Sequence, residues 1–289
     1  MRMKPNKSMM VILILLISIL FSCASTQQKQ IESKDAEAYY NQGLAYYQTG
    51  QYNQAISDFT KALEINPRDA KAYNNRGATY AAIGQHDKAI FDHTQAIELD
   101  PKNAGYYCTR AISFSMRGQY DQAISDCNKA LEINPRYADA YIERGLAYTE
   151  KGQYDQAISD FNKALDIDPK YDKAYNNRGN VYVKKENYDQ AISDYNKALE
   201  INPKYAVVYN NRGFANERKG QLDRAISDYN KAIEIDPKLV LAYTNRGIAY
   251  YLKKEYDKSW EDVKRVQNLG YQINPEFIEK LRKASGKQN

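Results

Sequence analysis

The sequence has few of the residues that most often carry metal or nucleophile chemistry. It contains 3 cysteines and 2 histidines in 289 residues, and a single tryptophan beside 27 tyrosines. A zinc site or a cysteine–histidine dyad needs several such residues brought together, so these site types are not expected. We therefore expect no enzyme activity, no metal and no cofactor.

The chain also lacks a strong excess of positive charge. Its formal charge of +5 falls to +2 once Arg2, Lys4 and Lys7 at the N-terminus are subtracted. Lysine and arginine alternate with aspartate and glutamate in every later segment, whereas nucleic-acid-binding proteins usually carry a basic patch. Neither a nucleic acid nor a small-molecule substrate is expected as a partner.

Long hydrophobic runs are limited to one, at Met9–Phe21. Its 13 residues are short for a bilayer span and typical of a signal-peptide core. The following segment, Leu20 to Cys23, resembles the lipobox of bacterial lipoproteins. This resemblance implies cleavage before Cys23, which would carry a diacylglycerol thioether and an acylated amino group. The alternative is an uncleaved signal anchor in which Cys23 has no special role.

The residues after Cys23 predict where the folded part works. Residues 1–22 are then the signal peptide, and 23–35 are the lipidated cysteine and a polar tether, which reaches at most about 40 Å. Ala24 and Ser25 follow the cysteine without the aspartate that marks inner-membrane retention in lipoproteins. The resemblance therefore implies a lipid anchor in the outer membrane, facing the periplasm, with surface exposure left open.

The rest of the chain repeats itself. Proline follows asparagine or aspartate at intervals of 34 residues, at Pro67, Pro101, Pro135, Pro169, Pro203 and Pro237. A fixed period of this length is typical of stacked repeats. The predicted repeats are seven, at 36–69, 70–103, 104–137, 138–171, 172–205, 206–239 and 240–273.

Each repeat contains two helical patterns. In the fourth, Tyr141, Gly145 and Tyr148 share one helix face, Gly152 interrupts the chain, and a second apolar face follows through Phe161. This pattern resembles the tetratricopeptide repeat, a helix-turn-helix unit. The resemblance implies an all-α, right-handed superhelical solenoid of seven repeats, whose first helices line a concave groove.

The copies are not identical. Ala111 replaces the first-helix glycine, His93 and Cys127 replace the second-helix aromatic residue, and Asn216 replaces a first-helix aromatic residue. His86 and His93 are predicted to pack in the core rather than bind metal. A disulfide between Cys108 and Cys127 is compatible with an oxidising compartment but is not implied.

A final helix is predicted at 274–289, where Asn274 and Pro275 form a helix start. Its apolar face, formed by Phe277, Ile278, Leu281 and Ala284, is expected to cap the end of the solenoid.

Opposite charges recur at two positions of the repeat. The seventh position is Gln42 and then arginine, and the twenty-third is aspartate throughout. Because the first repeat lacks the arginine, we predict that each aspartate pairs with the arginine of the next repeat. The predicted pairs are Asp58–Arg76, Asp92–Arg110, Asp126–Arg144, Asp160–Arg178, Asp194–Arg212 and Asp228–Arg246, with Asp262 left for Lys280 or Arg282. The alternative is a set of solvated surface charges.

A row of asparagines occupies the sixth position of the repeat. It comprises Asn41, Asn75, Asn177, Asn211 and Asn245, and Thr109 and Glu143 interrupt it. An asparagine amide offers a donor and an acceptor, as a peptide bond requires, and similar asparagine ladders occur in some superhelical repeat proteins. Three positions on, an apolar stripe is predicted from Leu44, Ile112, Leu146, Phe214 and Ile248, with Ala78 and Asn180 at the same position. The alternative is that both rows serve helix packing.

These features predict a membrane-anchored scaffold that binds a protein or extended peptide in its concave groove, in the assembly of a cell-envelope complex. The alternative from a different class is a structural lipoprotein that assembles with itself and has no peptide ligand. The identity of the partner is not encoded in any motif of the chain.

Overall fold

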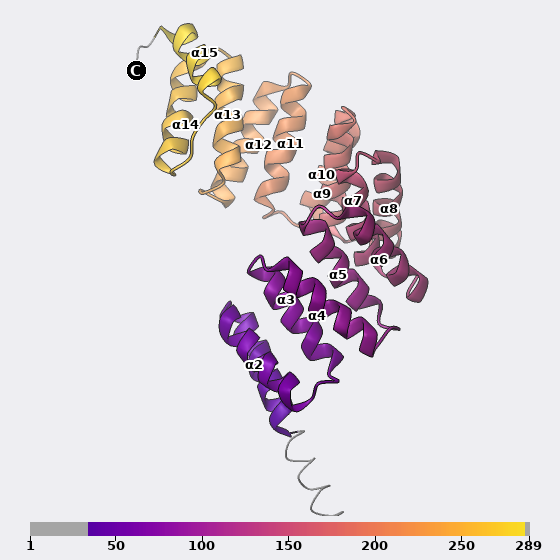
Figure 1. Ribbon diagram of the computed structural model, residues 1–289. Helices are drawn as coiled ribbons and strands as arrows, with labels where there is room; N and C mark the ends of the chain where they lie inside the picture. Colours follow the sequence, from indigo (N-terminus) through magenta and orange to yellow (C-terminus); the bar gives the residue numbers. More distant parts are fainter. Residues whose placement is uncertain (1–33, 287–289) are drawn as a thin grey trace, which may run out of the picture. The chain divides into compact units, whose positions relative to one another are not determined.

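The computed structural model describes residues 34–286, and these residues form helices joined by short turns, without strands (Figure 1). The predicted signal peptide, Cys23 and nearly all of the tether lie outside the described residues. None of the helices in residues 34–286 is long and apolar enough to cross a membrane.

The described chain divides into two compact units after Pro135. The first unit contains a helix at 34–48, followed by α2 (Tyr52–Ile65), α3 (Ala70–Ala82), α4 (His86–Leu99), α5 (Ala104–Met116) and α6 (Tyr120–Ile133).

The second unit begins with α7 (Ala138–Glu150), α8 (Tyr154–Ile167), α9 (Asp172–Lys184) and α10 (Tyr188–Ile201). It continues with α11 (Ala206–Arg218), α12 (Leu222–Ile235), α13 (Val240–Leu252), α14 (Tyr256–Asn268) and α15 (Pro275–Ser285).

The helices pair into hairpins, as the repeat pattern predicts. Within each hairpin the two helices pack together, and within each unit the first helix of one hairpin also contacts the first helix of the next, as α9 contacts α11. The first helices therefore form one continuous layer in each unit, and the second helices pack behind them. This all-α arrangement of about seven hairpins and a terminal helix confirms the predicted fold class.

In five of the seven hairpins, close packing depends on a glycine opposite an aromatic ring. A Cβ atom added at Gly179 would lie 2.6 Å from the ring of Tyr195, and one at Gly145 would lie 2.8 Å from the ring of Phe161. In the third repeat Ala111 stands at the glycine position, and the residue opposite is the smaller Cys127. The two helices therefore keep their close approach by a reciprocal exchange of side-chain size.

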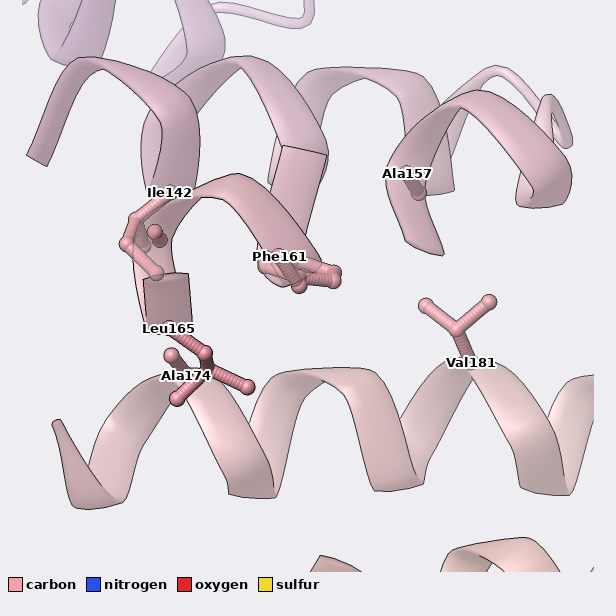
Figure 2. Close-up of a cluster of buried hydrophobic side chains, with 7 residues drawn as sticks. Ile142, Ala157, Phe161, Leu165, Ala174 and Val181 are labelled. Atoms are coloured by element: carbon pink, nitrogen blue, oxygen red, sulfur yellow. The ribbon is translucent and has the colours of Figure 1, made fainter. Parts of the chain in front are cut away.

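Figure 2 shows the apolar core between α7, α8 and α9. Ile142 from α7 and Phe161 and Leu165 from α8 are buried against Ala174 and Val181 of α9. The second helix of one repeat is thus held between two first helices. Because this cluster includes α9 of the following repeat, a repeat cannot bury its apolar surface alone.

The turn inside each hairpin places its central residue in a left-handed conformation. Glycine holds this position in five repeats, with φ between 72° and 75° at Gly50, Gly84, Gly118, Gly152 and Gly220. Glu186 and Lys254 stand there in the fifth and seventh repeats, with φ of 58° and 62°. A side chain in this region is strained, so these two turns store conformational energy.

The predicted terminal helix is present as α15. Asn274 accepts a hydrogen bond from the Glu276 amide at 2.8 Å, and Leu281 is fully buried against Val263 and Val266. Phe277 and Ile278 pack on the same cluster. Ala284, which was predicted to share this face, is exposed.

Candidate functional site

Each arginine of the repeat binds the aspartate of its own hairpin. Its Nε and Nη2 donate to the two carboxylate oxygens at 2.6–3.0 Å. The pairs are Arg76–Asp92, Arg110–Asp126, Arg144–Asp160, Arg178–Asp194, Arg212–Asp228 and Arg246–Asp262. The predicted pairing between neighbouring repeats is therefore wrong.

The first repeat explains why the prediction failed. Gln42 leaves Asp58 without an arginine in its hairpin, and Asp58 instead accepts from Lys61 Nζ, 3.0 Å away on the same helix. Asp262 pairs with Arg246, so it does not need the capping helix. There, Lys280 and Arg282 pair with glutamates of α15 itself.

A neutral contact does link the arginine to the preceding repeat. Arg76 Nη1 donates to Thr60 Oγ1 at 3.1 Å, and Arg212 Nη1 donates to Asn196 Oδ1 at 2.7 Å. Each guanidinium also lies over the tyrosine three residues earlier, at 5.3–5.9 Å from the ring centroid. With the aspartate side chains at most 9% exposed, these pairs are buried structural elements rather than surface charges.

The sixth-position row joins consecutive first helices. In the first unit, Asn75 Nδ2 donates to the Tyr40 hydroxyl at 2.8 Å, and Thr109 Oγ1 donates to Asn74 Oδ1 at 2.7 Å. In the second unit, Asn211 Nδ2 lies 3.1 Å from Asn176 Oδ1. Part of the hydrogen-bonding capacity of the row therefore holds the repeats together, which is the packing alternative raised above.

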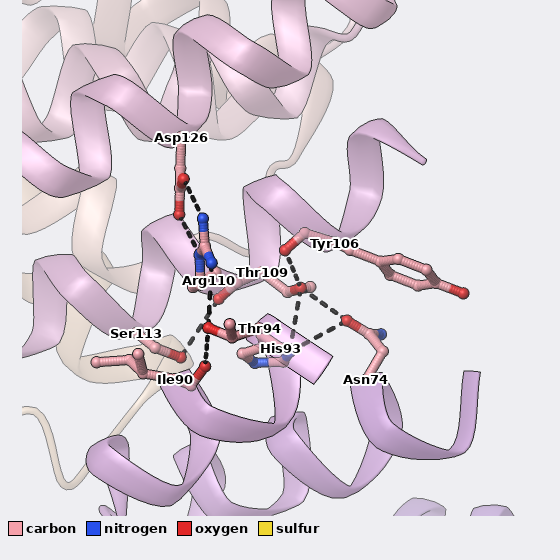
Figure 3. A network of polar contacts seen from close by, with 9 residues as sticks. All are labelled: Asn74, Ile90, His93, Thr94, Tyr106, Thr109, Arg110, Ser113 and Asp126. Carbon is pink, nitrogen blue, oxygen red and sulfur yellow. Dashed lines mark hydrogen bonds and ion pairs between the residues drawn. The ribbon is translucent and has the colours of Figure 1, made fainter. Parts of the chain in front are cut away.

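Figure 3 shows how this row meets a buried histidine in the first unit. His93 Nδ1 lies 3.2 Å from Asn74 Oδ1 and 3.3 Å from Thr109 Oγ1. Burial, reinforced by the positive charge of Arg110, lowers the pKa of His93 to about 4. His93 is thus a neutral core residue at neutral pH.

Residues 34–286 contain no group of three or more histidine, cysteine, aspartate or glutamate side chains able to hold a metal ion. Cys108 and Cys127 are both buried.

The second unit contains a pocket of about 330 Å³ over its first helices. Its lining residues come from α9, α10, α11 and α13, and are Asn180, Val183, Lys184, Tyr195, Asn210, Asn211, Phe214 and Asn245. Three of these, Asn211, Phe214 and Asn245, were predicted as groove residues. The structure brings them together because each stands on a first helix, and the first helices lie side by side.

Hydrogen bonds between side chains fix the amides of this pocket. Asn180 Oδ1 accepts from the Tyr195 hydroxyl at 2.7 Å and from Asn211 Nδ2 at 3.1 Å. Asn245 Nδ2 donates to Asn210 Oδ1 at 3.0 Å. Burial raises the pKa of Tyr195, so its hydroxyl stays a hydrogen-bond donor at all physiological pH values. The amides are therefore oriented before any ligand binds.

The remaining predicted groove residues do not line this pocket. Leu146 and Asn177 belong to the second unit, where Leu146 packs on the apolar core beside Phe161. Ile248 is half-buried on α13. The first unit holds the others, with Asn41 exposed and Leu44, Asn75 and Ile112 half-buried.

Sequence reasoning did not select Asn180, Asn210, Lys184, Val183 or Tyr195 as binding residues. The sequence does distinguish Asn180, because it is the one polar residue in the apolar stripe at the ninth position of the repeat. The other four carry no such signal: Val183, Tyr195 and Asn210 stand at positions that are partly or fully buried in most other repeats, and Lys184 stands at a position that is exposed in every repeat.

Glu143 interrupts the asparagine row with an ionisable group. Burial raises the pKa of its carboxyl to about 7, and the nearby Asp139 adds to this effect while Lys173 opposes it. A carboxyl group in this position changes charge close to neutral pH.

Hairpins of about 34 residues, joined by hydrogen bonds between successive first helices, define a helical repeat protein. One family model described as tetratricopeptide repeat matches residues 36–69, 70–103, 104–137 and 172–205. A second model with the same description matches residues 127–159 and 194–227. A model described as TPR repeat matches 145–186 and 218–254. The chain belongs to the tetratricopeptide repeat family.

Solved structures show the same fold. A tetratricopeptide repeat protein from Parabacteroides merdae is 23% identical, with a TM-score of 0.66 over 88% of this chain and 100% of that chain. A thermophilic repeat protein from Thermus thermophilus is 25% identical, with a TM-score of 0.55 over 62% and 98%. The MamA protein is 30% identical, with a TM-score of 0.50 over 60% and 94%. None of the curated proteins compared matches this chain.

Proposed function

We propose that this protein is a lipid-anchored scaffold that binds an extended segment of a partner protein in the amide-lined pocket of its second unit. The observation that carries the proposal is the set of oriented amides, Asn180, Asn210, Asn211 and Asn245, around one pocket that also presents Phe214. Tetratricopeptide repeat proteins commonly bind proteins or peptides, which supports this assignment.

The pocket suits the chemistry of a peptide backbone. Asn245 uses one N–H toward Asn210, which leaves its second N–H and its carbonyl oxygen for other partners. Val183 and Phe214 supply apolar surface beside these amides, and Lys184 adds one positive charge at the pocket. An extended segment with an apolar side chain and a nearby acidic group satisfies all three features.

The anchoring part of the proposal rests on the sequence alone. The apolar run Met9–Phe21 and the lipobox-like segment ending at Cys23 support a lipid anchor at the cell envelope. A scaffold tethered in this way would hold its partner close to the membrane, as an envelope assembly factor requires.

Crosslinking in cells tests the pocket. A photoreactive amino acid replaces Phe214 in the pocket, and in a matched strain it replaces Leu241, which is 60% exposed on α13 and does not line the pocket. We expect a specific partner to be trapped from position 214 and not from 241. Equal trapping from both positions would count against the pocket, and trapping of a second copy of this chain alone would favour the self-assembling alternative.

Affinity measurements on the captured segment separate binding from packing. Asn245→Ala should weaken binding about fivefold to tenfold, as the loss of one peptide-directed hydrogen bond does. Asn177→Ala provides the control, because Asn177 holds the same repeat position on α9 outside the pocket. Similar losses in both variants would argue that the row acts only through repeat packing.

The anchor has a separate test. Cells expressing the wild-type protein or Cys23→Ala are labelled with an alkynyl fatty acid, and membranes are then separated from soluble proteins. We expect label and membrane association with the wild type, and loss of both with the variant. Unchanged labelling of Cys23→Ala would disprove lipidation at this cysteine without affecting the pocket assignment.

A further inference from the structure

A hydrogen-bonded pair stands in the fifth repeat where the fourth has an apolar pair. The ninth and twenty-fourth positions of the fourth repeat hold Leu146 and Phe161, which pack in one apolar cluster. The same positions of the fifth repeat hold Asn180 and Tyr195, and the Tyr195 hydroxyl donates to Asn180 Oδ1 at 2.7 Å. Both residues line the amide-lined pocket, so the exchange changes the chemistry of that pocket.

The carbonyl oxygen of Asn180 is fully used inside the protein. It accepts from the Tyr195 hydroxyl and from Asn211 Nδ2, and an amide oxygen has two lone pairs. No residue of 34–286 accepts a hydrogen bond from Asn180 Nδ2. Turning the amide over would bring its NH2 group against that of Asn211 and would leave the hydroxyl of Tyr195, a side chain 1% exposed, without an acceptor. Asn180 therefore presents two N–H donors to the pocket.

Asn211 has the opposite polarity. Its Nδ2 donates to Asn176 Oδ1 and to Asn180 Oδ1, each at 3.1 Å, which uses both of its N–H groups. Its Oδ1 accepts from Asn210 Nδ2 at 3.4 Å and keeps a second lone pair. Because α9 and α11 contact each other, the pocket has a donor group on one helix beside an acceptor group on the other.

We propose that Tyr195 is a positioning residue of this pocket, whose hydroxyl holds the Asn180 amide so that a main-chain carbonyl of the bound segment is recognised at Asn180 and a main-chain N–H at Asn211. This inference rests on the proposed function and adds the place of each group of the ligand. Tyr195 acts through Asn180, because its hydroxyl proton is already donated to that side chain.

Two small probes and the full-length protein test the role of Tyr195. N-acetyl-phenylalanine N-methylamide has a ring, carbonyl groups and N–H groups, whereas toluene has the ring and no hydrogen-bonding group. Their affinities are measured from NMR chemical-shift changes at Phe214. Tyr195→Phe removes only the hydroxyl and restores the residue type of Phe161, so the fold is kept. We expect it to weaken the amide probe about fivefold and to leave the affinity for toluene unchanged.

Two further variants separate positioning from packing. Asn180→Asp keeps an oxygen that accepts from Tyr195 and Asn211 but has no N–H, so it should weaken the amide probe about tenfold and leave toluene unchanged. Tyr229→Phe is the matched control, because the Tyr229 hydroxyl donates to Glu217 at 3.1 Å and neither residue lines the pocket. It should leave the affinity for both probes unchanged.

The outcomes distinguish this inference from the proposed function. Equal weakening of both probes by Tyr195→Phe would show an effect on packing, and an unchanged affinity for the amide probe would show that the hydroxyl has no role. Either result overturns the positioning role while the pocket still binds the amide probe. A wild-type protein that binds neither probe would refute the pocket as a peptide site, and the role of Tyr195 with it.

Discussion

Arg178 donates through Nε and Nη2 to both carboxylate oxygens of Asp194, at 2.8 and 2.6 Å, across the hairpin of α9 and α10. The Asp194 side chain is 7% exposed and that of Arg178 is 18% exposed, so solvent screens the pair weakly. The guanidinium also lies 5.5 Å from the ring of Tyr175. One side chain therefore ties together two helices and an aromatic ring of the same repeat.

A double-mutant cycle measures this pair. Removing one partner, as in Asp194→Leu, should destabilise the protein by about 3 kcal/mol, because it leaves a buried charge without its counter-ion. Replacing both Arg178 and Asp194 by leucine should cost clearly less than the sum of the single changes. Urea unfolding of the four proteins gives the coupling free energy.

The control cycle uses Asp160 with Arg178, the pair that lies in neighbouring repeats. Asp160 is bound by Arg144, so its coupling to Arg178 should be close to zero. A larger coupling for Asp160 than for Asp194 would contradict the hairpin pairing.

The sequence predicted that arginine and aspartate pair, but not the direction of pairing. The only sequence clue was Gln42, and it misled because Asp58 finds an alternative partner, Lys61, on its own helix. Direction depends on how closely the two helices of a hairpin approach. The distance between the two helices is set by contacts such as that of Gly179 with the Tyr195 ring. The repeat pattern predicts that these residues meet, but it does not give the distance between them.

The glycine–aromatic contact predicts a specific steric effect. Gly179→Ala places a methyl group 2.6 Å from the Tyr195 ring, so it should destabilise the protein by about 1–3 kcal/mol. Gly247→Ala is the matched control, since the nearest atom there is 3.4 Å away and alanine favours helix. In a Tyr195→Cys background, which copies the Ala111–Cys127 combination, the cost of Gly179→Ala should disappear. Thermal unfolding measures the stability of both variants. Equal losses of stability for Gly179→Ala and Gly247→Ala would contradict the steric explanation.

The turn at Glu186 predicts a stabilising substitution. Its φ of 58° is costly for a residue with a side chain, and five of the other turns relieve this cost with glycine. Glu186→Gly should therefore raise the unfolding free energy by up to about 1 kcal/mol. Gly152→Ala, at the same repeat position with φ of 73°, should lower it. A decrease in stability for Glu186→Gly would show that the side chain has a compensating role.

The site was less predictable than the fold. Periodicity identifies which residues lie on first helices, and it correctly placed Asn211, Phe214 and Asn245 on one layer. It cannot tell which amides are used up in holding the repeats together, as Asn75 is with Tyr40. It also treats Asn180 as one irregular position, although Asn180 accepts hydrogen bonds from two neighbours and orients the pocket.

His93 predicts a loss of stability in acid. Its pKa is about 4 in the folded chain and about 6.5 when unfolded, so the unfolded state binds more protons between these values. Stability should fall as the pH drops from 6.5 toward 4, by at most about 1.4 kcal/mol per pH unit. His93→Phe, which restores the residue type of Phe59 and Phe161, should remove this contribution, whereas His86→Tyr should not. Identical pH profiles for His93→Phe and wild type would refute the assignment.

Glu143 predicts a contribution of the opposite direction. Its pKa of about 7 in the folded chain lies above the value of 4.5 expected when unfolded, so the folded state binds more protons between pH 4.5 and 7. Stability should fall as the pH rises through this window, by at most about 1.4 kcal/mol per unit, and should be level above pH 7. Glu143→Gln keeps the shape of the side chain but cannot ionise, so its stability should exceed that of wild type at pH 8 and approach it at pH 4.5. Urea unfolding of both proteins across this range provides the measurement. A constant difference between them at every pH would mean that Glu143 does not titrate in the window, and that the polar group alone accounts for its effect.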